Sequence, residues 1–364
     1  MKNAKIKLFI FNPYSVIGGT ELSLSRLINF FLKKKNYDIT YICLNNSALK
    51  FYLKGKIQII KLKKSRTLFT FLSLRKILRE HNYNNFRKTV FISNQNYANV
   101  FSILSLYNFK KLKKIAIERT PLNELDTYEN LSKFFKSFII KFLIKLSYNK
   151  FDIVICISNY IAKGLKKLSN CKIKVIYNPS FFLKYKTFLK YRNIKIFLNV
   201  ARLEKSKDHL TLLKSIKILK KKYDEKFKLI IIGHGKEKGN ILKYIKDNFL
   251  KKNVKIINSR KPEKYYKISD LFILTSKYEG FGNVLIEAAS HNLPIISTKS
   301  GGTIEILKNG KYGKLINTED YKSLSKILSD FLNNKNKIKK IDVNHLKKFS
   351  HKNLIQYEKT IQRI

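Results

Sequence analysis

The segment "LFILTSKYEGFGNVLIEAASHNLPIIST", residues 271–298, contains one complete strand–helix–strand unit. Apolar runs of strand length stand at 271–275 and 294–298, and a helix-like segment at 283–291 lies between them. A helix that joins two such strands is typical of a parallel sheet. The loop before the helix holds Glu279, one of only 24 acidic residues, which makes it a candidate binding loop.

The same alternation extends through the rest of the chain. In the first half we predict strands at 6–11, 39–44, 57–62, 89–92, 114–118, 152–157 and 173–176, and helices at 20–34, 68–81, 96–107, 129–148 and 159–168. In the second half we predict strands at 194–200, 227–232, 254–257, 271–275, 294–298 and 314–316, and helices at 207–222, 236–249, 262–268, 283–291, 302–308, 320–334 and 350–362. Residues 178–193 begin with a turn signal and show no clean period, which predicts a linker between two domains.

The chain is strongly basic: 76 Lys and Arg stand against 24 Asp and Glu, a formal net charge of +52. Such a field attracts anionic surfaces and phosphorylated ligands. Only ten of the basic residues are Arg, and Asn and Ile are abundant as well. This composition also fits a genome-wide bias toward Lys, Asn and Ile. The charge can therefore serve a function, or it can reflect lysines that are merely solvated at the surface, and both interpretations stay open.

The apolar fraction of 44% indicates a globular chain. No apolar run reaches the roughly 20 residues that a bilayer-spanning helix needs. The N-terminal apolar run has no small-residue cleavage site, so we expect no signal peptide and a cytoplasmic protein. The three cysteines lack the spacing of a zinc site, and we expect them to be buried thiols.

Two predicted strand-to-helix loops contain paired glycines. Gly18 and Gly19 precede the first helix, and Gly233 and Gly235 follow the strand at 227–232. Glycines at such places let a backbone approach a ligand closely and leave helix amides available to a phosphate. A plain tight turn explains either pair equally well.

A third loop, "ARLEKSKDH" at 201–209, places Arg202 and Lys207 around the start of a helix. Two cations beside helix amides fit a diphosphate, because Arg can hold two oxygens and Lys acts as a point charge. Among 76 basic residues the alternative is that both are ordinary surface cations.

The loop after the strand at 271–275 combines acids with a helix start. The amides that open this helix have no acceptor within it, and a phosphate fits there. Glu287, further along the helix, can accept hydrogen bonds from a vicinal diol such as a ribose, while Glu279 reaches toward a sugar. We expect the loop to bind its ligand through Gly280, Phe281, Gly282, Asn283 and Val284.

In order and approximate spacing these segments resemble the retaining glycosyltransferases of family 4. The resemblance rests on "GGTE" (18–21), "IYNP" (176–179), "ARLEKSKDH" (201–209), "GHGKEKG" (233–239), the block at 276–307 with its Glu-x7-Glu pattern, and "NGKYG" (309–313). It implies an α/β fold of GT-B architecture, with two Rossmann-like doubly wound domains facing a central cleft. The implied domains are an acceptor domain at 1–180, a donor domain at 181–345 and a C-terminal helix at 346–364 that packs back on the first.

The resemblance also assigns roles. Arg202 and Lys207, with the amides of Asn283 and Val284, would hold the diphosphate of the donor, and Arg202, Lys207 and Glu279 would act in catalysis. Glu287 would bind the ribose and Glu279 the sugar, while Gly18 and Gly19 would close over the donor from the other domain.

The chain departs from the family pattern in three respects. Ser259 stands where the family often has glycine, beside Arg260 in the loop expected at the nucleobase. Ser180 stands where an acid often follows the "NP" turn. Members often show a histidine near Asn94 or Arg119, and we predict these two residues as acceptor contacts.

The implied reaction moves a hexose or N-acetylhexosamine from a nucleotide sugar, with a UDP sugar expected first. The acceptor would be a surface glycan such as lipopolysaccharide, capsule or a lipid-linked oligosaccharide, and the anomeric configuration would be retained. No Asp-x-Asp pair occurs, so we expect no metal and no cofactor, with cations and amides stabilising the leaving diphosphate. We nominate no protein base, because a phosphate oxygen of the donor can take the proton.

Two other functions are weighed against transfer. A sugar-nucleotide epimerase of the same shape would need acid–base residues at the sugar, and only Glu279 is offered there. A nucleic-acid-binding protein would explain the charge, but the basic residues are scattered and no recognised motif is present. We therefore expect no nucleic-acid partner.

The helix predicted within 130–150 has an apolar face with lysines on the remainder. Such a helix can lie on an anionic membrane surface, or it can pack into the core with lysines that reflect composition. Both interpretations stay open for the helix, while the total charge favours peripheral association with the inner face of the cell membrane.

Overall fold

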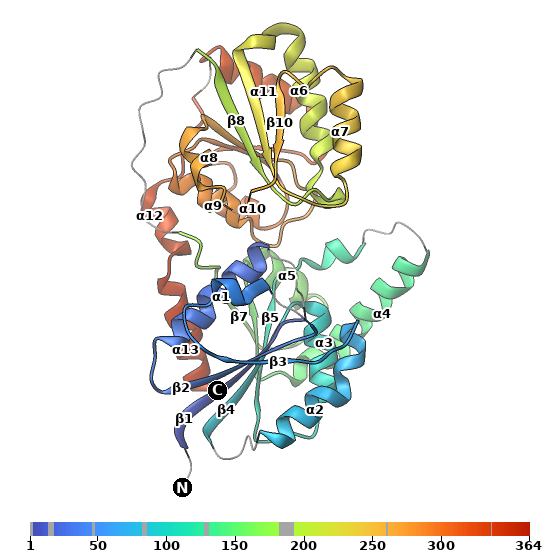
Figure 1. Ribbon diagram of the computed structural model, residues 1–364, viewed down its shortest axis with the longest axis vertical. Helices are drawn as coiled ribbons and strands as arrows, with labels where there is room; N and C mark the ends of the chain where they lie inside the picture. Colours follow the sequence, from blue (N-terminus) through green and yellow to red (C-terminus); the bar gives the residue numbers. More distant parts are fainter. Residues whose placement is uncertain are drawn as a thin grey trace. The chain divides into compact units, whose positions relative to one another are not determined.

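In the computed structural model, the described part of the chain comprises residues 3–13, 18–45, 48–81, 86–126, 131–181, 193–259, 261–335 and 337–364. The chain forms two compact units (Figure 1). Unit 1 is Met1–Pro179 with His351–Ile364, and unit 2 is Ser180–Ser350. Most of the predicted linker, at 182–192, lies outside the described residues.

Unit 1 contains a parallel sheet of seven strands in the order β3-β2-β1-β4-β5-β6-β7. The strands are β1 (Asn3–Phe11), β2 (Tyr37–Cys43), β3 (Gln58–Lys61), β4 (Phe86–Asn94), β5 (Lys113–Glu118), β6 (Ile153–Cys156) and β7 (Ile173–Val175). The central strands are apolar on both faces because helices cover both. Each corresponds to a predicted strand.

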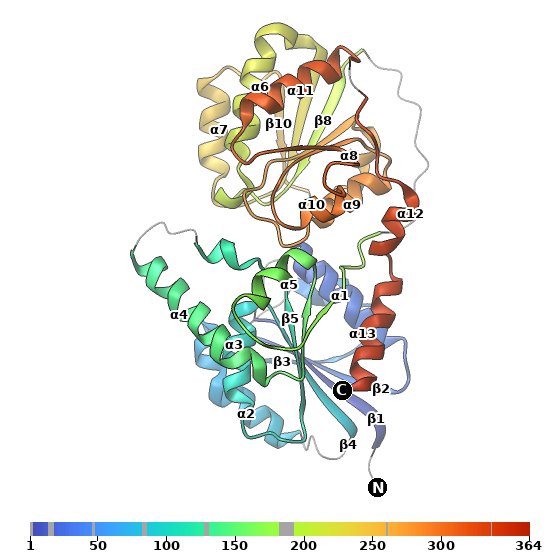
Figure 2. The same cartoon turned by 180° about the vertical axis from the view of Figure 1, so that it is seen from behind.

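The helices of unit 1 are α1 (Gly19–Leu32), α2 (Phe71–Glu80), α3 (Asn96–Ser105), α4 (Leu131–Ser147), α5 (Asn159–Lys166) and α13 (Lys352–Arg363). Short 3₁₀ segments include η1 (Ala48–Tyr52), η2 (Thr67–Thr70), η4 (Leu122–Asp126) and η5 (Tyr148–Lys150). Helix α3 lies between α2 and α4, and α1 and α13 lie on the other side of the sheet (Figures 1 and 2). Phe9, Phe11 and Phe91 lie in the core beneath α2 and α3.

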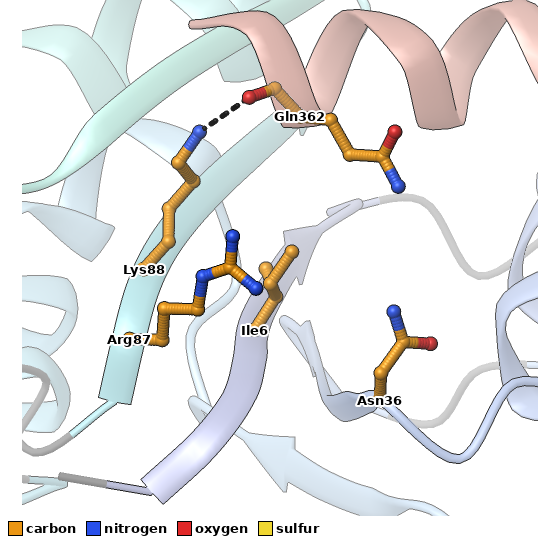
Figure 3. A pocket seen from close by; sticks show the side chains of 5 residues that line it. All are labelled: Ile6, Asn36, Arg87, Lys88 and Gln362. Atoms are coloured by element: carbon orange, nitrogen blue, oxygen red, sulfur yellow. Dashed lines mark hydrogen bonds between the residues drawn. The ribbon is translucent and has the colours of Figure 1, made fainter.

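Helix α13 is held in unit 1 by polar contacts at both ends. Asn353 donates to the carbonyl of Tyr177 at 3.2 Å, and Lys34, just after α1, pairs with Glu358 at 2.7 Å. At the last turn Lys88 donates to the carbonyls of Ile361 (3.2 Å) and Gln362 (2.9 Å), beside a small pocket shown in Figure 3. A cation at a helix C-terminus satisfies carbonyls that have no partner within the helix.

Unit 2 contains a parallel sheet of six strands in the order β10-β9-β8-β11-β12-β13. The strands are β8 (Lys195–Val200), β9 (Phe227–Ile232), β10 (Val254–Ile257), β11 (Leu271–Leu274), β12 (Ile295–Thr298) and β13 (Lys314–Ile316). Phe197 of β8 stacks on Phe227 of β9 at 5.5 Å in the core. The topology is doubly wound, as predicted.

The helices of unit 2 are α6 (His209–Tyr223), α7 (Lys238–Asp247), α8 (Glu263–Ile268), α9 (Asn283–Ser290), α10 (Gly302–Ile306), α11 (Tyr321–Leu332) and α12 (Val343–Leu346), with 3₁₀ segments η6 (Lys205–Lys207), η7 (Asp224–Lys226) and η8 (Lys347–Phe349). We did not predict α12, which is one turn long. Its signal is Asp342, whose carboxylate accepts from the amide of Asn344 at 2.6 Å as a helix cap.

Candidate active site

The loops that follow β8 and β11 meet because these strands are neighbours in a parallel sheet. The hydroxyl of Thr275, just after β11, donates to the carbonyl of Asp208 at 2.9 Å. The amide of Lys277 donates to the carbonyl of Ser206 at 2.8 Å. These bonds fix the Arg202–Lys207 loop against the Glu279 loop, so the structure brings together two segments that lie about 70 residues apart in the sequence.

Lys207 and Glu279 form an ion pair at the centre of this site, with 2.6 Å between Nζ and Oε1. Their side chains are only 15% and 14% exposed. The hydroxyl of Ser276 donates to the same Oε1 at 2.9 Å. A part-buried ammonium and carboxylate that already face each other form a site where a ligand with a phosphate and a hydroxyl can exchange partners with both. We did not predict Ser276, although it stands only three residues before Glu279.

Arg202 lies at the edge of the site and is more exposed than Lys207. Its guanidinium donates to Glu204 at 2.9 Å, and the side chains are 48% and 38% exposed. An exposed pair of this kind contributes little to stability. Arg202 can therefore turn toward an anionic ligand at small cost.

Helix α9 begins directly after the Glu279 loop. Gly282 precedes it at φ 101°, in the left-handed region that favours glycine. Phe281 is buried and packs edge-on against Phe349 at 5.5 Å, which anchors the loop below the helix start. The side chain of Asn283 accepts from Ser180 at 2.8 Å. Helix α9 therefore starts four residues after Glu279, with Asn283 and Val284 as its first residues.

Gly302, which we did not predict as a site residue, allows a second loop to lie against this one. Its amide donates to the carbonyl of Glu279 at 3.1 Å. A Cβ at position 302 would lie 2.5 Å from the Cα of Phe281, so no other residue fits. The sequence signal is the pair Gly301–Gly302 after β12, inside the block on which the family resemblance rests.

Glu287 lies on α9 and is held by the neighbouring helix α8. The hydroxyl of Tyr266 donates to its Oε2 at 3.1 Å. Tyr266 is buried and stacks on His291 at 5.0 Å, and His291 in turn contacts the carbonyl of Glu287 through Nδ1 at 2.8 Å. The carboxylate of Glu287 therefore has a fixed direction. We did not predict this contact of Tyr266 with Glu287.

Gly233 and Gly235 have a packing role. A Cβ at Gly233 would lie 1.9 Å from the carbonyl oxygen of Ala201, and one at Gly235 would lie 2.3 Å from that of Leu203. The amide of Leu203 donates to the carbonyl of His234 at 2.8 Å. These glycines let the loop after β9 support the loop that carries Arg202. A direct ligand contact by either stays a prediction.

In unit 1, Gly18 is the N-cap of α1 and Gly19 its first residue. A Cβ at Gly18 would lie 3.2 Å from Oε2 of Glu21, a buried acid. Gly18 therefore leaves room for this carboxylate beneath the start of the helix. The predicted contact of the glycine pair with a donor stays a prediction.

Asn94 and Arg119, predicted as acceptor contacts, lie in a buried polar network of unit 1. Arg119 is 6% exposed and Asn94 is fully buried. The guanidinium of Arg119 donates to Oδ1 of Asn94 at 2.6 Å and to Oδ1 of Asn178 at 2.8 Å. The hydroxyl of Ser23 on α1 donates to the same Asn178 oxygen at 2.9 Å. The network ties the ends of β4 and β5 to α1 and to the turn at "IYNP".

Glu118, adjacent to Arg119, is buried and accepts four hydrogen bonds. Its donors include Tyr148 at 2.6 Å and the amides of Arg119 and Thr120 at 3.0 and 3.2 Å. Burial raises the pKa of Glu118 to about 7, because these hydrogen bonds only partly offset the loss of water. Burial also lowers the pKa of the Arg119 guanidinium.

Arg260 lies outside the described residues, so its predicted place at a nucleobase stays a prediction. Among the residues that are described, no cluster of three or more His, Cys, Asp or Glu side chains is arranged to hold a metal ion.

Comparison with known proteins accounts for both units. A family model described as Glycosyltransferase Family 4 matches residues 17–179, and one described as Glycosyl transferases group 1 matches residues 184–348. An uncharacterized glycosyltransferase of Methanocaldococcus jannaschii is 30% identical over 302 residues, covering 74% of this chain and 72% of the relative. The chain belongs to this glycosyltransferase family. Its Lys207–Glu279 loop pair thus lies in the half matched by the group 1 model.

Two further similarities place this glycosyltransferase among known ones. The capsular polysaccharide biosynthesis glycosyltransferase CapM of Staphylococcus aureus is 26% identical over 345 residues, covering 88% of this chain and 87% of the relative. The crystal structure of Anabaena Alr3699/HepE in complex with UDP and glucose superposes with a TM-score of 0.78 at 15% identity, covering 98% of this chain and 99% of that one. The structural likeness confirms the predicted GT-B fold of two Rossmann-like domains.

Proposed function

We propose that this glycosyltransferase moves a hexose or N-acetylhexosamine from a nucleotide sugar, with a UDP sugar as the first candidate, to a surface-glycan acceptor with retention of configuration. The observation that carries the proposal is the part-buried Lys207–Glu279 pair beside the start of α9, with Glu287 on the same helix. A nucleoside diphosphate sugar offers two phosphates, a ribose diol and a hexose to these groups in one molecule.

The donor would bind by replacing contacts that exist within unit 2. A phosphate oxygen would take the place of Glu279 at the ammonium of Lys207, and a sugar hydroxyl would take the place of Lys207 at the carboxylate of Glu279. The amides that open α9 would hold the second phosphate. Glu287, oriented by Tyr266, would accept from the ribose hydroxyls. The structural neighbour bound to UDP and glucose supports this class of donor.

The chemistry requires that negative charge on the leaving diphosphate be stabilised as the anomeric bond breaks. Lys207 and the α9 amides would supply that stabilisation from positions set by the fold, and Arg202 would join them by turning from Glu204 toward the bound diphosphate. The proposal therefore includes no metal ion and no cofactor. The acceptor hydroxyl would attack the face that the diphosphate leaves, and a phosphate oxygen of the donor would take its proton.

The acceptor class is proposed from relatives rather than from a site. The name of the Staphylococcus aureus relative places that protein in capsular polysaccharide biosynthesis. A growing surface glycan, including one linked to a lipid, is the acceptor class that we propose for this chain. Peripheral association with the inner face of the cell membrane forms part of the proposal, and a nucleic-acid partner does not.

Calorimetry with UDP, GDP and ADP, in EDTA and again with magnesium, tests the donor half of the proposal. We expect binding of at least one diphosphate in EDTA, with little change when magnesium is added. A panel of sugar nucleotides, followed by the slow release of free sugar, then identifies the donor. The coupling constant of the anomeric proton in the product reports the configuration. The proposal fails if no nucleoside diphosphate binds or if binding appears only with a divalent ion.

A further inference from the structure

Helix α4 places its wide apolar face outward, against the core-packing interpretation. The helix packs through a narrow stripe of Ser137, Ile140, Ile144 and Ser147, which are all buried. Two of these four residues are small and polar. The larger apolar side chains that the sequence pattern assigned to one face are therefore not used to hold α4 against unit 1.

The outward side chains of α4 form a continuous apolar strip. Its members are 42–77% exposed and comprise Leu131, Phe134, Phe135, Phe138, Ile139, Phe142 and Leu146. Phe134 and Phe135 pack edge to face at 5.7 Å. Exposed apolar side chains that lie side by side on a protein surface, as these seven do, indicate an interaction site.

A second exposed apolar patch lies at the start of α2. Leu68 and Phe69 of η2 and Phe71 and Leu72 of α2 are 39–75% exposed. They line a groove of about 590 Å³ together with Lys63, Lys64, Ser65 and Ser73. We did not predict this patch from the sequence.

Helix α3 joins the two patches, because it contacts both η2–α2 and α4. Its C-terminal end exposes Leu104, and Tyr107 follows just after it, 67% exposed. Figures 1 and 2 show α2, α3 and α4 side by side on one side of the sheet. We call the exposed surface of η2, α2, α3 and α4 the docking layer.

The docking layer is bordered by cations. Residues 61–79 contain seven Lys and Arg and no acidic residue, and residues 134–150 contain four Lys and no acidic residue. Arg75 lies over the rings of Phe71 and Phe109, at 5.6 Å from each. Lys136 of α4 lies 4.9 Å from the ring of Tyr97 on α3. Of these rings Phe71 is exposed and Phe109 is buried. Long basic side chains beside exposed apolar side chains can reach phosphates while the apolar groups enter an apolar phase.

We propose that the docking layer binds the surface of an anionic lipid bilayer, with the outward strip of α4 and the η2–α2 patch entering the headgroup boundary. The inference rests on the proposed membrane association and names the surface that performs it. A second copy of the chain fits less well, because it would bring lysines against lysines. An anionic bilayer supplies both the apolar phase and the opposite charge over an area as broad as three adjacent helices.

The absence of Trp from the chain allows a direct test. Three single-tryptophan variants, Phe138→Trp in α4, Leu72→Trp in α2 and the control Phe249→Trp, are mixed with vesicles of phosphatidylglycerol and phosphatidylcholine. Phe249 is an 80% exposed aromatic in unit 2, also beside lysines, and so matches the test positions in chemistry. We expect blue-shifted emission and quenching by brominated lipid at 138 and 72 but not at 249. Equal quenching at 249, or none at 138, contradicts the assignment.

Sedimentation of the wild-type chain and serine variants with the same vesicles measures the affinity. The double variant Phe135→Ser/Phe138→Ser should lose about tenfold or more in partitioning, and Phe69→Ser/Leu72→Ser should lose a comparable factor. Phe249→Ser should bind as wild type, and vesicles of phosphatidylcholine alone should bind all variants weakly. Far-UV circular dichroism and urea unfolding verify that each variant is folded, in unit 1 as well as in unit 2.

The remaining outcomes each exclude a different idea. If the wild-type chain does not bind anionic vesicles, this inference and the membrane part of the proposed function are both wrong. UDP binding by the same chain would still support the proposed donor site. If the wild type binds but the serine variants bind equally, the charge acts alone and the docking layer is refuted. If light scattering shows a dimer for the wild type and a monomer for Phe135→Ser/Phe138→Ser, while vesicle binding is unchanged, the docking layer serves self-association instead.

Discussion

The two units place their most polar side chains at the same topological position, the carboxyl ends of parallel strands, and use them differently. In unit 2, Lys207 and Glu279 pair across two neighbouring loops, with side chains 15% and 14% exposed. In unit 1, Arg119 and Asn94 are buried and hydrogen-bond each other, and Arg119 also donates to Asn178. The comparison supports the proposal that unit 2 exchanges these groups with a ligand, while the predicted contact of Asn94 and Arg119 with an acceptor stays a prediction.

The largest effect should follow from removing the exchangeable cation. Lys207→Met should lower kcat/KM by about 100- to 1,000-fold, the range measured when one donor to a developing anion is lost. The substitution also leaves the carboxylate of Glu279 without its ion pair. Lys205→Met, an exposed lysine two residues away, serves as the control and should remain near wild-type activity. Steady-state kinetics with the identified donor makes the measurement, and a fully active Lys207→Met enzyme removes the lysine from the mechanism.

The next effect should fall on stability rather than on catalysis. Arg119→Met removes the buried donor from Oδ1 of Asn94 and leaves Oδ1 of Asn178 with the hydroxyl of Ser23, and we expect a loss of about 3 kcal/mol in the free energy of unfolding. Urea titration of the wild type and the variant, with Arg79→Met on the exposed end of α2 as the control, gives the difference. If Arg119→Met keeps its stability and instead raises KM for the acceptor alone, Arg119 is an acceptor contact and the proposed division between the units is wrong.

The sequence predicted most of the fold because its strands are short apolar runs separated by helices, and such a pattern has few competing interpretations. Strands β9, β10 and β13 match the predicted bounds, and no predicted strand is missing from the described residues. The Lys207–Glu279 site was also within reach, since each residue follows a predicted strand. Tyr266 was not, because an ordinary tyrosine on a short helix gives no signal until α8 lies against α9.

The sequence pattern also could not predict which side chains of α4 are exposed or that Arg119 is buried. The outward face of α4 and the inward Arg119 reverse the usual expectations for apolar and charged residues. In both places the outcome depends on partners distant in the sequence, Asn178 for Arg119 and α3 for α4. Local periodicity shows that a helix has two faces but leaves open which face is covered.

A pH dependence should be associated with the buried network of unit 1. Burial raises the pKa of Glu118 from an ordinary 4.5 to about 7, so the folded state binds its proton more tightly than the unfolded chain between these values. The stabilisation is fully present below pH 4.5 and is lost as the pH rises through 7, on the order of 3 kcal/mol in total. Glu118→Gln should reduce the change of the thermal unfolding midpoint with pH between 4.5 and 7. Glu80→Gln on the surface should leave that change as in the wild type. If the thermal midpoint of Glu118→Gln changes with pH as in the wild type, a group other than Glu118 causes the pH dependence.

The smallest effect tests how unit 2 orients its acid. Tyr266→Phe removes one hydrogen bond to Glu287 and should weaken UDP by about 3- to 10-fold, corresponding to roughly 1 kcal/mol. If Tyr266 positions Glu287, the substitution should also change how the protein discriminates between UDP and its deoxy analogues. Each of 2′-deoxy-UDP and 3′-deoxy-UDP lacks one ribose hydroxyl that would donate a hydrogen bond to Glu287. The wild type should prefer UDP over these analogues, Tyr266→Phe should lose part of that preference, and Tyr265→Phe, the same change one residue away, should retain it. If Tyr266→Phe weakens UDP and both analogues equally, the tyrosine only supports the packing of α8 against His291, and Glu287 needs no orienting partner.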